Sequence, residues 1–182
     1  MKLPSDFSIV KYDTFLRLAR IDDAEFILSL RLNPNRNKHL SIVSDDLEAQ
    51  KNWLRDYKYR EEKGEEYYFL VGDISEKLYG TIRLYHFQKT KYVFGSWIFC
   101  EDAPEGLAIK GDIIGREIAF DILGFTTCLF DVRKNNSLVL RYHRGWNPIM
   151  IGENERNFYF ELSYEKFNTH KLKLLKLLEY GH

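Results

Sequence analysis

The sequence lacks an excess of either charge, a set of cysteines and any long apolar run, and each absence excludes a class of protein. Its 27 basic side chains balance 27 acidic ones, so it has no general positive charge for binding nucleic acid. Its 2 cysteines and the absence of a signal-like stretch after Met1 do not fit a secreted disulfide scaffold. They predict a reducing, cytoplasmic location. The longest apolar cluster, residues 113–123, is interrupted by Arg116 and Glu117 and is too short to cross a membrane.

The sequence also contains no internal repeat, low-complexity segment or linker. Its 182 residues are close to the usual size of one domain. A chain of this size can bury roughly 70% of its unfolded surface in one core. We therefore expect a single domain over residues 1–182, without stabilising disulfides or metal.

The first third of the chain predicts one strand followed by two helices. Residues 15–19 have strand character. Asp22 and Glu25 have the Asp-x-x-Glu spacing that is typical of a helix start. This helix should end before Pro34, because the residue before proline avoids the helical conformation. Residues 44–46 can cap a second helix, which should end at Gly64.

The rest of the chain alternates apolar runs of strand length with segments of helical periodicity. The order predicts a mixed α+β or α/β fold, with a central, mostly antiparallel mixed sheet flanked by helices. The first three strands of this part should form an antiparallel meander. The expected strands are residues 67–71, 81–87, 92–100, 127–132 and 158–162, and the expected helices are residues 107–123, ended by Gly124, 137–146, capped by Asn135 or Asn136, and 165–180.

Several segments, in this order, resemble one known family. Residues 16–27 (LRLARIDDAEFI), 80–85 (GTIRLY) and 95–98 (GSWI) look like parts of the Gcn-related (GNAT) superfamily of acetyl-CoA-dependent N-acetyltransferases. They are most similar to a bacterial subgroup whose members are often encoded with surface-polysaccharide genes. The resemblance spans nearly the whole chain, and it implies a GNAT fold, acetyl-CoA (coenzyme A) as cofactor, a small-molecule amine as acceptor and no metal.

The cofactor motif of this superfamily is Gln/Arg-x-x-Gly-x-Gly/Ala, and residues 103–108 occupy its place. Small residues there let free amides at a helix start approach a pyrophosphate. Gly106 and Ala108 fit, but Ala103 stands where the motif has a basic or amide side chain. An ordinary turn that opens an amphipathic helix is the alternative interpretation. The resemblance implies cofactor contacts from Ile98, Phe99, Cys100, Gly106, Leu107, Ala108, Ile109, Lys110, Asn136 and Val139.

A second family pattern, Asn-x-x-Ala/Val-x-x-x-Tyr/His, matches Asn136, Val139 and His143. The resemblance implies that His143, or else Tyr142, protonates the departing thiolate. The alternative is a helix histidine whose positive form suits the helix dipole. After the helix the family usually has glycine and an aromatic residue. Here Asn147 follows, and asparagine also tolerates the left-handed conformation.

The chemistry implied is attack of a neutral amine on the acetyl thioester in a ternary complex, through a tetrahedral intermediate. A backbone N–H near Ile98 and Phe99, where two strands diverge, would stabilise the oxyanion. Glu66, Ser96 or Glu25 could relay the amine proton through water, although each can equally be a structural side chain. A weakly basic sugar amine could also lose its proton to solvent.

The acceptor pocket of this superfamily lies between the first helices and the central strands. Arginines there suit a phosphate-bearing acceptor, and aromatic rings can stack on a sugar or base. The alternative is that these aromatics only pack the sheet. We favour an amino sugar, nucleotide-linked, over a protein N-terminus or lysine and over an inactive cofactor-binding module. The leucines of residues 165–180 could pack on this domain or on a second subunit of a homodimer. The implied acceptor-binding residues are Arg31, Tyr68, Arg83, Tyr85, His86, Ser96 and Trp97.

Overall fold

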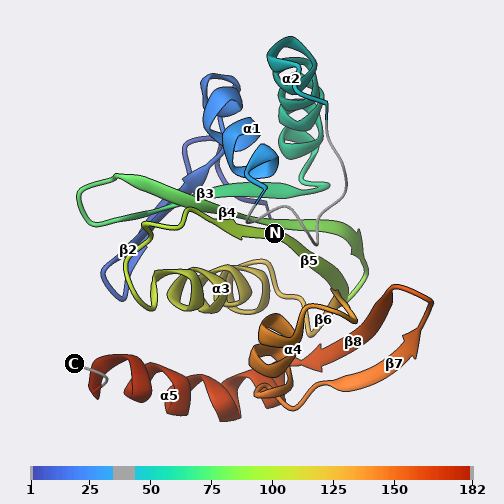
Figure 1. Ribbon diagram of the computed structural model, residues 1–182. Coiled ribbons are helices and arrows are strands. Elements are labelled where there is room, and N and C mark those ends of the chain that lie inside the picture. The colour runs from blue at the N-terminus through green and yellow to red at the C-terminus, as the bar shows by residue number, and fades with distance from the viewer. Residues whose placement is uncertain (1, 35–43, 181–182) are drawn as a thin grey trace.

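A single mixed sheet organises the computed structural model, which describes residues 2–34 and 44–180. The sheet has 8 strands in the order β1-β2-β3-β4-β5-β6-β8-β7 (Figure 1). Only β5 and β6 pair in parallel, so the predicted mostly antiparallel mixed sheet is confirmed. The strands are β1 (Ser8–Lys11), β2 (Thr14–Leu18), β3 (Tyr67–Asp73), β4 (Leu78–Gln88), β5 (Lys91–Phe99), β6 (Thr127–Arg133), β7 (Ile149–Glu153) and β8 (Asn157–Ser163).

Helices cover both faces of the sheet. In Figure 1, α1 and α2 lie on one face, and α3 and α5 lie on the other. The smaller apolar core, which includes Ile27, Leu54 and Tyr68, lies under α1 and α2. The larger core lies between the sheet, α3 and α5. The helices are α1 (Ala24–Leu32), α2 (Leu47–Lys63), α3 (Leu107–Glu117), α4 (Ser137–Arg144) and α5 (Tyr164–Tyr180). None of the helices in the described ranges is long and apolar enough to span a bilayer.

The ends of the helices follow the local signals in the sequence. The Asp46 side chain caps α2 by accepting a hydrogen bond from the Ala49 amide at 3.0 Å. Gly64 ends α2 with a left-handed φ of 74°, a conformation that glycine adopts without steric cost. Asn136 rather than Asn135 caps α4. Asn147 follows α4 with a φ of 55°, so asparagine keeps the left-handed exit where the family usually has glycine.

The sheet opens between β5 and β6, and this gap positions the site. The two strands pair only as far as Val93 and Leu129, although β5 continues to Phe99 and β6 to Arg133. In the same stretch β5 carries a bulge at Ser96, whose φ is 51°. Bulges concentrate next to active sites because they redirect side chains and end strand pairing.

Some elements differ from the sequence predictions. The helix expected over residues 107–123 ends as an α-helix at Glu117 and continues as a π-helical turn, Ile118–Ile122, before Gly124. Strands β1 and β7 were not predicted. β7 is an edge strand in which three consecutive apolar residues are exposed, so it lacks the alternation that marks a half-buried strand.

The last helix packs on the described chain itself. Leu174, Leu175 and Leu178 contact the larger core, whereas Leu172 and Leu177 are exposed. Of the two alternatives left open by the sequence, the structure shows packing within the chain. A homodimer stays a prediction.

Glu117 joins three segments that are distant in sequence. Its carboxylate accepts hydrogen bonds from Lys11 Nζ at 2.7 Å, Tyr12 Oη at 2.9 Å and Lys171 Nζ at 2.9 Å. The first hairpin and α5 are thereby both tied to the end of α3.

Candidate functional site

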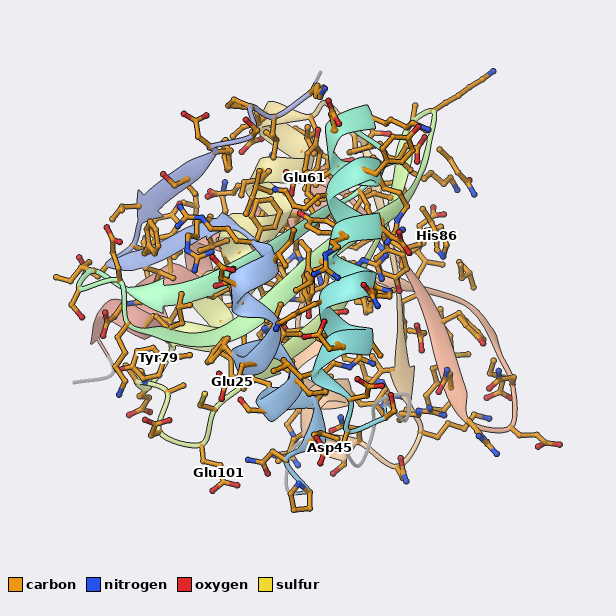
Figure 2. The ribbon with its side chains drawn as sticks, turned by 90° about the horizontal axis from the view of Figure 1, so that it is seen from above. Glu25, Asp45, Glu61, Tyr79, His86 and Glu101 are labelled. Carbon is orange, nitrogen blue, oxygen red and sulfur yellow. The ribbon has the colours of Figure 1, made fainter. Side chains whose placement is uncertain are left out.

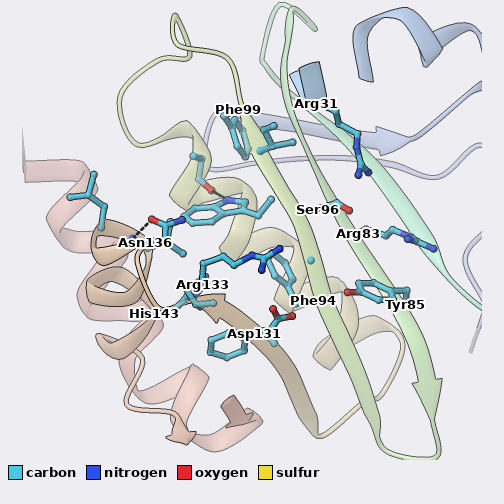
Figure 3. Close-up of a pocket in the computed structure, with 18 of the residues that line it drawn as sticks. Arg31, Arg83, Tyr85, Phe94, Ser96, Phe99, Asp131, Arg133, Asn136 and His143 are labelled. Carbon is cyan, nitrogen blue, oxygen red and sulfur yellow. Dashed lines mark hydrogen bonds between the residues drawn. The ribbon is translucent and has the colours of Figure 1, made fainter. Parts of the chain in front are cut away.

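A cavity of about 740 Å³ lies in the gap between β5 and β6 (Figure 3). Its volume is within the range of small-molecule sites. Strands β3 to β6 form one side of it, and α1, α3 and α4 contribute to the rest. The lining residues are Arg31, Tyr68, Arg83, Tyr85, Phe94, Gly95, Ser96, Trp97, Ile98, Phe99, Ala108, Phe130, Asp131, Val132, Arg133, Asn136, Leu138, Val139 and His143.

The start of α3 presents free amides beside the cavity. The Leu107 amide donates to Pro104 O at 3.1 Å and the Lys110 amide to Gly106 O at 2.9 Å. The amides of Ala108 and Ile109 make no hydrogen bond within the described chain. Free amides at a helix start, with the helix dipole behind them, are suited to an anion. Of the amides expected to contact pyrophosphate, two are therefore available and two are already used.

Gly106 keeps this turn open. Its φ is 76°, and an added Cβ would lie 2.9 Å from Leu178 Cδ2 of α5. Ala103, the departure from the family motif, is partly buried and packs against the larger core. Its methyl group is therefore a packing group, and it leaves the backbone of the turn unchanged.

The end of β5, which packs against α3, offers a further amide beside the cavity. The Cys100 amide donates to Tyr79 O of β4 at 2.7 Å. Because successive amides of a strand point to opposite sides, the Phe99 amide points toward the gap. Phe99 and Ile98 line the cavity, whereas Cys100 does not. A contact of Cys100 with the cofactor stays a prediction.

His143 and Tyr142, the two candidate acids, have different surroundings. His143 lines the cavity and is buried, with its ring 4.7 Å from the Phe130 ring and 5.4 Å from the Trp97 ring. Burial, reinforced by the Arg116 charge, holds the pKa of His143 well below its usual range. The imidazole is therefore neutral. This disagrees with the alternative interpretation, in which a positively charged histidine suits the helix dipole.

The Tyr142 hydroxyl points away from the cavity into the core. It donates to Asp112 Oδ2 at 2.5 Å, and burial together with the Asp112 charge raises the pKa of Tyr142 well above its ordinary value. Asp112 is also paired with Arg116 Nε at 2.9 Å, and both side chains are fully buried. Tyr142 does not line the cavity. It supports Trp97, whose ring stacks on it at 5.1 Å.

A network of arginines and aromatic rings lies on the side of the cavity next to α2. Glu66 pairs with Arg60 at 3.0 Å and with Arg83. The Arg83 guanidinium lies 5.0 Å from the Trp53 ring and 4.7 Å from the Tyr85 ring. With its carboxylate held by two arginines, Glu66 is a structural side chain rather than a free proton relay.

Asp131 and Arg133 were missed by sequence reasoning. Figure 3 shows both side chains directed into the gap, across from Tyr85. Asp131 accepts a hydrogen bond from Asn157 Nδ2 at 2.8 Å. The residue is exposed, but partial desolvation of its carboxylate raises the pKa of Asp131, and the charge of Arg133 partly opposes this. Both residues lie in the segment that carries the second family pattern, but only the separation of β5 from β6 makes them accessible.

A smaller cavity of about 250 Å³ adjoins the larger one and shares Arg31 and Tyr68 with it. Helix α2 contributes Gln50 and Trp53 to it. The space beside the sheet therefore extends toward the two N-terminal helices, as expected for the acceptor pocket.

Not every candidate residue lies at the cavity. His86 is exposed on β4, with its ring against Tyr85, and Glu25 is exposed on α1 (Figure 2). Neither residue lines either cavity. The predicted residues that line the larger cavity are Arg31, Tyr68, Arg83, Tyr85, Ser96, Trp97, Ile98, Phe99, Ala108, Asn136, Val139 and His143, and those that do not are Cys100, Gly106, Leu107, Ile109, Lys110, His86 and Tyr142.

Neither a family model nor a curated protein matches the chain, but solved structures do. FdhC, solved in its apo form and described as a nucleotide-linked sugar GNAT, is 34% identical, with 92% of this chain and 96% of FdhC covered and a TM-score of 0.83. The ribosomal-protein-S5-alanine acetyltransferase of Vibrio fischeri is 15% identical, with 89% and 99% covered and a TM-score of 0.75. The spermidine N-acetyltransferase of Vibrio cholerae, solved with CoA and spermine, is 17% identical, with 87% and 99% covered and a TM-score of 0.75. At such low identity the last two similarities show a shared fold.

Proposed function

The chain belongs to the GNAT family of N-acetyltransferases, and we propose that it transfers the acetyl group of acetyl-CoA to the primary amine of a nucleotide-linked amino sugar. One observation carries the proposal. A single cavity joins the helix start and Asn136 on one side to the arginine-bearing wall with Arg31 and Arg83 on the other. Two ligands that enter from these sides can meet between β5 and β6. Holding both in one complex makes the transfer effectively intramolecular.

The residues on the first side fit acetyl-CoA, which supplies an activated acetyl thioester when bound. The free amides of Ala108 and Ile109 and the open turn at Gly106 suit a pyrophosphate. Asn136 and Val139 line the cavity and suit the pantetheine arm. The chain has no net charge, so these local groups must attract the anion.

The other side fits a phosphate-bearing acceptor. A guanidinium matches phosphate oxygens with two parallel hydrogen bonds, and arginine side chains from α1, β4 and β6 line the cavity. Tyr68 and Tyr85 add aromatic surface for a sugar or base. The 34% identity with FdhC, a nucleotide-linked sugar GNAT, supports the same acceptor class.

Asp131 is the best-placed proton acceptor. Among the described residues that line the cavity it is the one carboxylate. Within the described chain its side chain accepts a hydrogen bond from Asn157 at one oxygen, which leaves the other oxygen available to the amine. Because partial desolvation raises its pKa, Asp131 is a stronger base than an ordinary aspartate.

Two further groups act on the charge that develops during transfer. The Phe99 amide points into the gap and can donate a hydrogen bond to a carbonyl oxygen that becomes negative. His143 faces the same cavity and can donate a hydrogen bond to a sulfur leaving group. Tyr142 is excluded from this second role because its hydroxyl is bound to Asp112.

A thiol-release screen tests the proposal. The protein is incubated with acetyl-CoA and, in separate arms, with nucleotide-linked amino sugars, the same sugars without the nucleotide, and N-terminal peptides. Turnover should be highest in the first arm. Preference for the peptides would support the protein-acetylating alternative and overturn the acceptor class, and no turnover in any arm would overturn the activity.

A further inference from the structure

A fully buried ion pair lies behind the cavity wall that carries His143. Arg116 donates from Nε to Asp112 Oδ1 at 2.9 Å and from Nη1 to Cys128 Sγ at 3.0 Å. Burial alone would lower the pKa of Arg116, but the Asp112 carboxylate raises it. The guanidinium is thus a permanent cation under the site.

Two buried polar atoms, one on Arg116 and one on His143, have no hydrogen-bond partner within the described chain. They are Arg116 Nη2 and His143 Nδ1. Buried polar groups are almost always satisfied, directly or through an ordered water.

The chemistry of these two atoms favours one position for the proton on His143. Arg116 Nη2 can only donate, whereas His143 Nδ1 can accept in one tautomer. With the proton on Nδ1, both unsatisfied atoms would be donors. With the proton on Nε2, a donor and an acceptor are present, and one ordered water can satisfy both.

Packing places Arg116 and His143 against the same ring. The Arg116 guanidinium lies 5.2 Å from the centre of the Phe130 ring, and the His143 ring lies 4.7 Å from it. The Arg116 charge acts on His143 and lowers the pKa of its ring, so a lone pair on Nδ1 is stabilised by the guanidinium, and an N–H in its place is repelled. Since Nδ1 is enclosed, the Nε2 edge is the side of the ring that reaches the cavity.

We propose that Arg116 is a positioning residue that fixes His143 in the tautomer with a buried Nδ1 acceptor and a proton on Nε2 at the cavity. This inference rests on the proposed function, because it states how His143 presents its donor to the sulfur. His143 stays neutral at physiological pH and donates a hydrogen bond without first taking up a proton. Arg116 is the charged group that acts on His143, and the Tyr142 ring lies 5.0 Å from it. The titratable groups around Arg116 are Asp112 on α3, Cys128 on β6, Tyr92 on β5 and Tyr142 on α4.

The direct test measures the tautomer without any substrate. Two-bond ¹H–¹⁵N correlation spectra distinguish Nε2–H, Nδ1–H and charged imidazoles, and the signals of His143 are those lost in His143→Gln. We expect the Nε2–H pattern from pH 6 to 8 with no titration. An Nδ1–H pattern, or titration near the ordinary histidine pKa of about 6.5, would overturn the proposal whatever acceptor the enzyme uses.

Paired substitutions give a kinetic test once an accepted amine is known. The amide nitrogen of glutamine lies near the place of Nε2, and that of asparagine near the place of Nδ1. His143→Gln should therefore keep at least tenfold more kcat than His143→Asn at equal KM for acetyl-CoA. Equal activity of the two variants would contradict a donor at Nε2.

The role of Arg116 is tested in a background that avoids an unpaired buried charge. Arg116→Met alone leaves Asp112 uncompensated and can fail to fold, so Asp112→Asn/Arg116→Met, which removes both charges, is compared with the wild type. In the double variant the pKa of His143 should rise toward its ordinary value, and Nδ1–H should become populated. A folded double variant with an unchanged tautomer and pKa would show that Arg116 does not position His143.

Discussion

Tyr142 Oη and Asp112 Oδ2 form a hydrogen bond of 2.5 Å between α4 and α3. This bond separates the functions of two residues that are adjacent in the sequence. Tyr142 serves the core, and His143, one position further, faces the cavity. Helical geometry turns consecutive residues by about 100°, which is enough to place them in different environments.

Replacing each of the two residues by phenylalanine should therefore have opposite effects. Tyr142→Phe leaves Asp112 without a donor and should lower the free energy of unfolding by about 2 kcal/mol, while kcat changes less than threefold. His143→Phe should lower kcat by about 100-fold with little change in stability. Denaturant unfolding and thiol release measure both quantities, and a catalytic loss confined to Tyr142→Phe would reverse our assignment.

Asp131→Asn tests the proton acceptor. The amide keeps an oxygen for Asn157 but removes the base, so kcat/KM should fall by about 100-fold. The wild-type rate should decline as pH falls and Asp131 takes up a proton, and the variant should lack this decline. Asp121→Asn, which changes an exposed carboxylate that lines neither cavity, is the matched control.

The same variant should not be destabilised at neutral pH. The pKa of Asp131 is raised in the folded protein, so the fold favours the protonated form and loses stability as pH rises through that pKa. Removing the charge should leave the free energy of unfolding at pH 7 unchanged or slightly higher. A marked loss of stability would mean that reduced activity reflects unfolding.

Arg31→Gln tests whether the acceptor carries phosphate. Loss of one charged hydrogen bond should raise KM for a nucleotide-linked amino sugar about tenfold. KM for the same sugar without the nucleotide and KM for acetyl-CoA should not change. Arg55→Gln, on the exposed face of α2, controls for net charge, and equal losses with both acceptors would exclude phosphate recognition by Arg31.

Thermal unfolding tests cofactor binding without requiring an acceptor. A ligand that binds the folded state at 100 times its Kd adds about 2.7 kcal/mol, so acetyl-CoA should raise Tm by several degrees. Acetyl-pantetheine, which lacks the pyrophosphate, should give a smaller rise at the same concentration. Equal shifts would argue against anion binding at the start of α3, and no shift with acetyl-CoA would support an inactive module.

Glu117→Gln tests the acid sensitivity of the fold. Burial alone would raise the pKa of Glu117, but the hydrogen bonds from Lys11 and Lys171 lower it. Glu117 therefore adds stability above the ordinary glutamate pKa, and this is lost as pH falls through the lowered value. The variant should lose about 2 kcal/mol at pH 7 and little near pH 3. Glu62→Gln, which changes an exposed carboxylate of α2, should show neither change.

The order and type of most elements were predictable because their signals are local. Asp46 and Gly64 mark the ends of α2 through capping and a left-handed turn, and both are visible in the sequence. The edge strands were missed for a local reason as well. Ile149, Met150 and Ile151 are each 54% exposed, so an apolar residue at these positions does not indicate that the position is buried.

The site was predictable only in part because its geometry depends on contacts between distant segments. Asn136 and His143 were found through a spacing that one helix fixes. Asp131 lines the cavity because β6 separates from β5 after Leu129, and no residue of β6 indicates that separation in the sequence. The choice between Tyr142 and His143 depended on Asp112, which in the sequence is one charged residue of an amphipathic helix.

The contact of Gly106 with Leu178 has a consequence for how such an enzyme can evolve. The turn that would receive the pyrophosphate lies against Leu178 of α5. Helix α5 contributes no residue to the described lining of either cavity. Substitutions along α5 can tune the strength of cofactor binding, and substitutions in α1 and α2 can change the acceptor. Because the two sets of positions are separate, selection can adjust one property while it preserves the other.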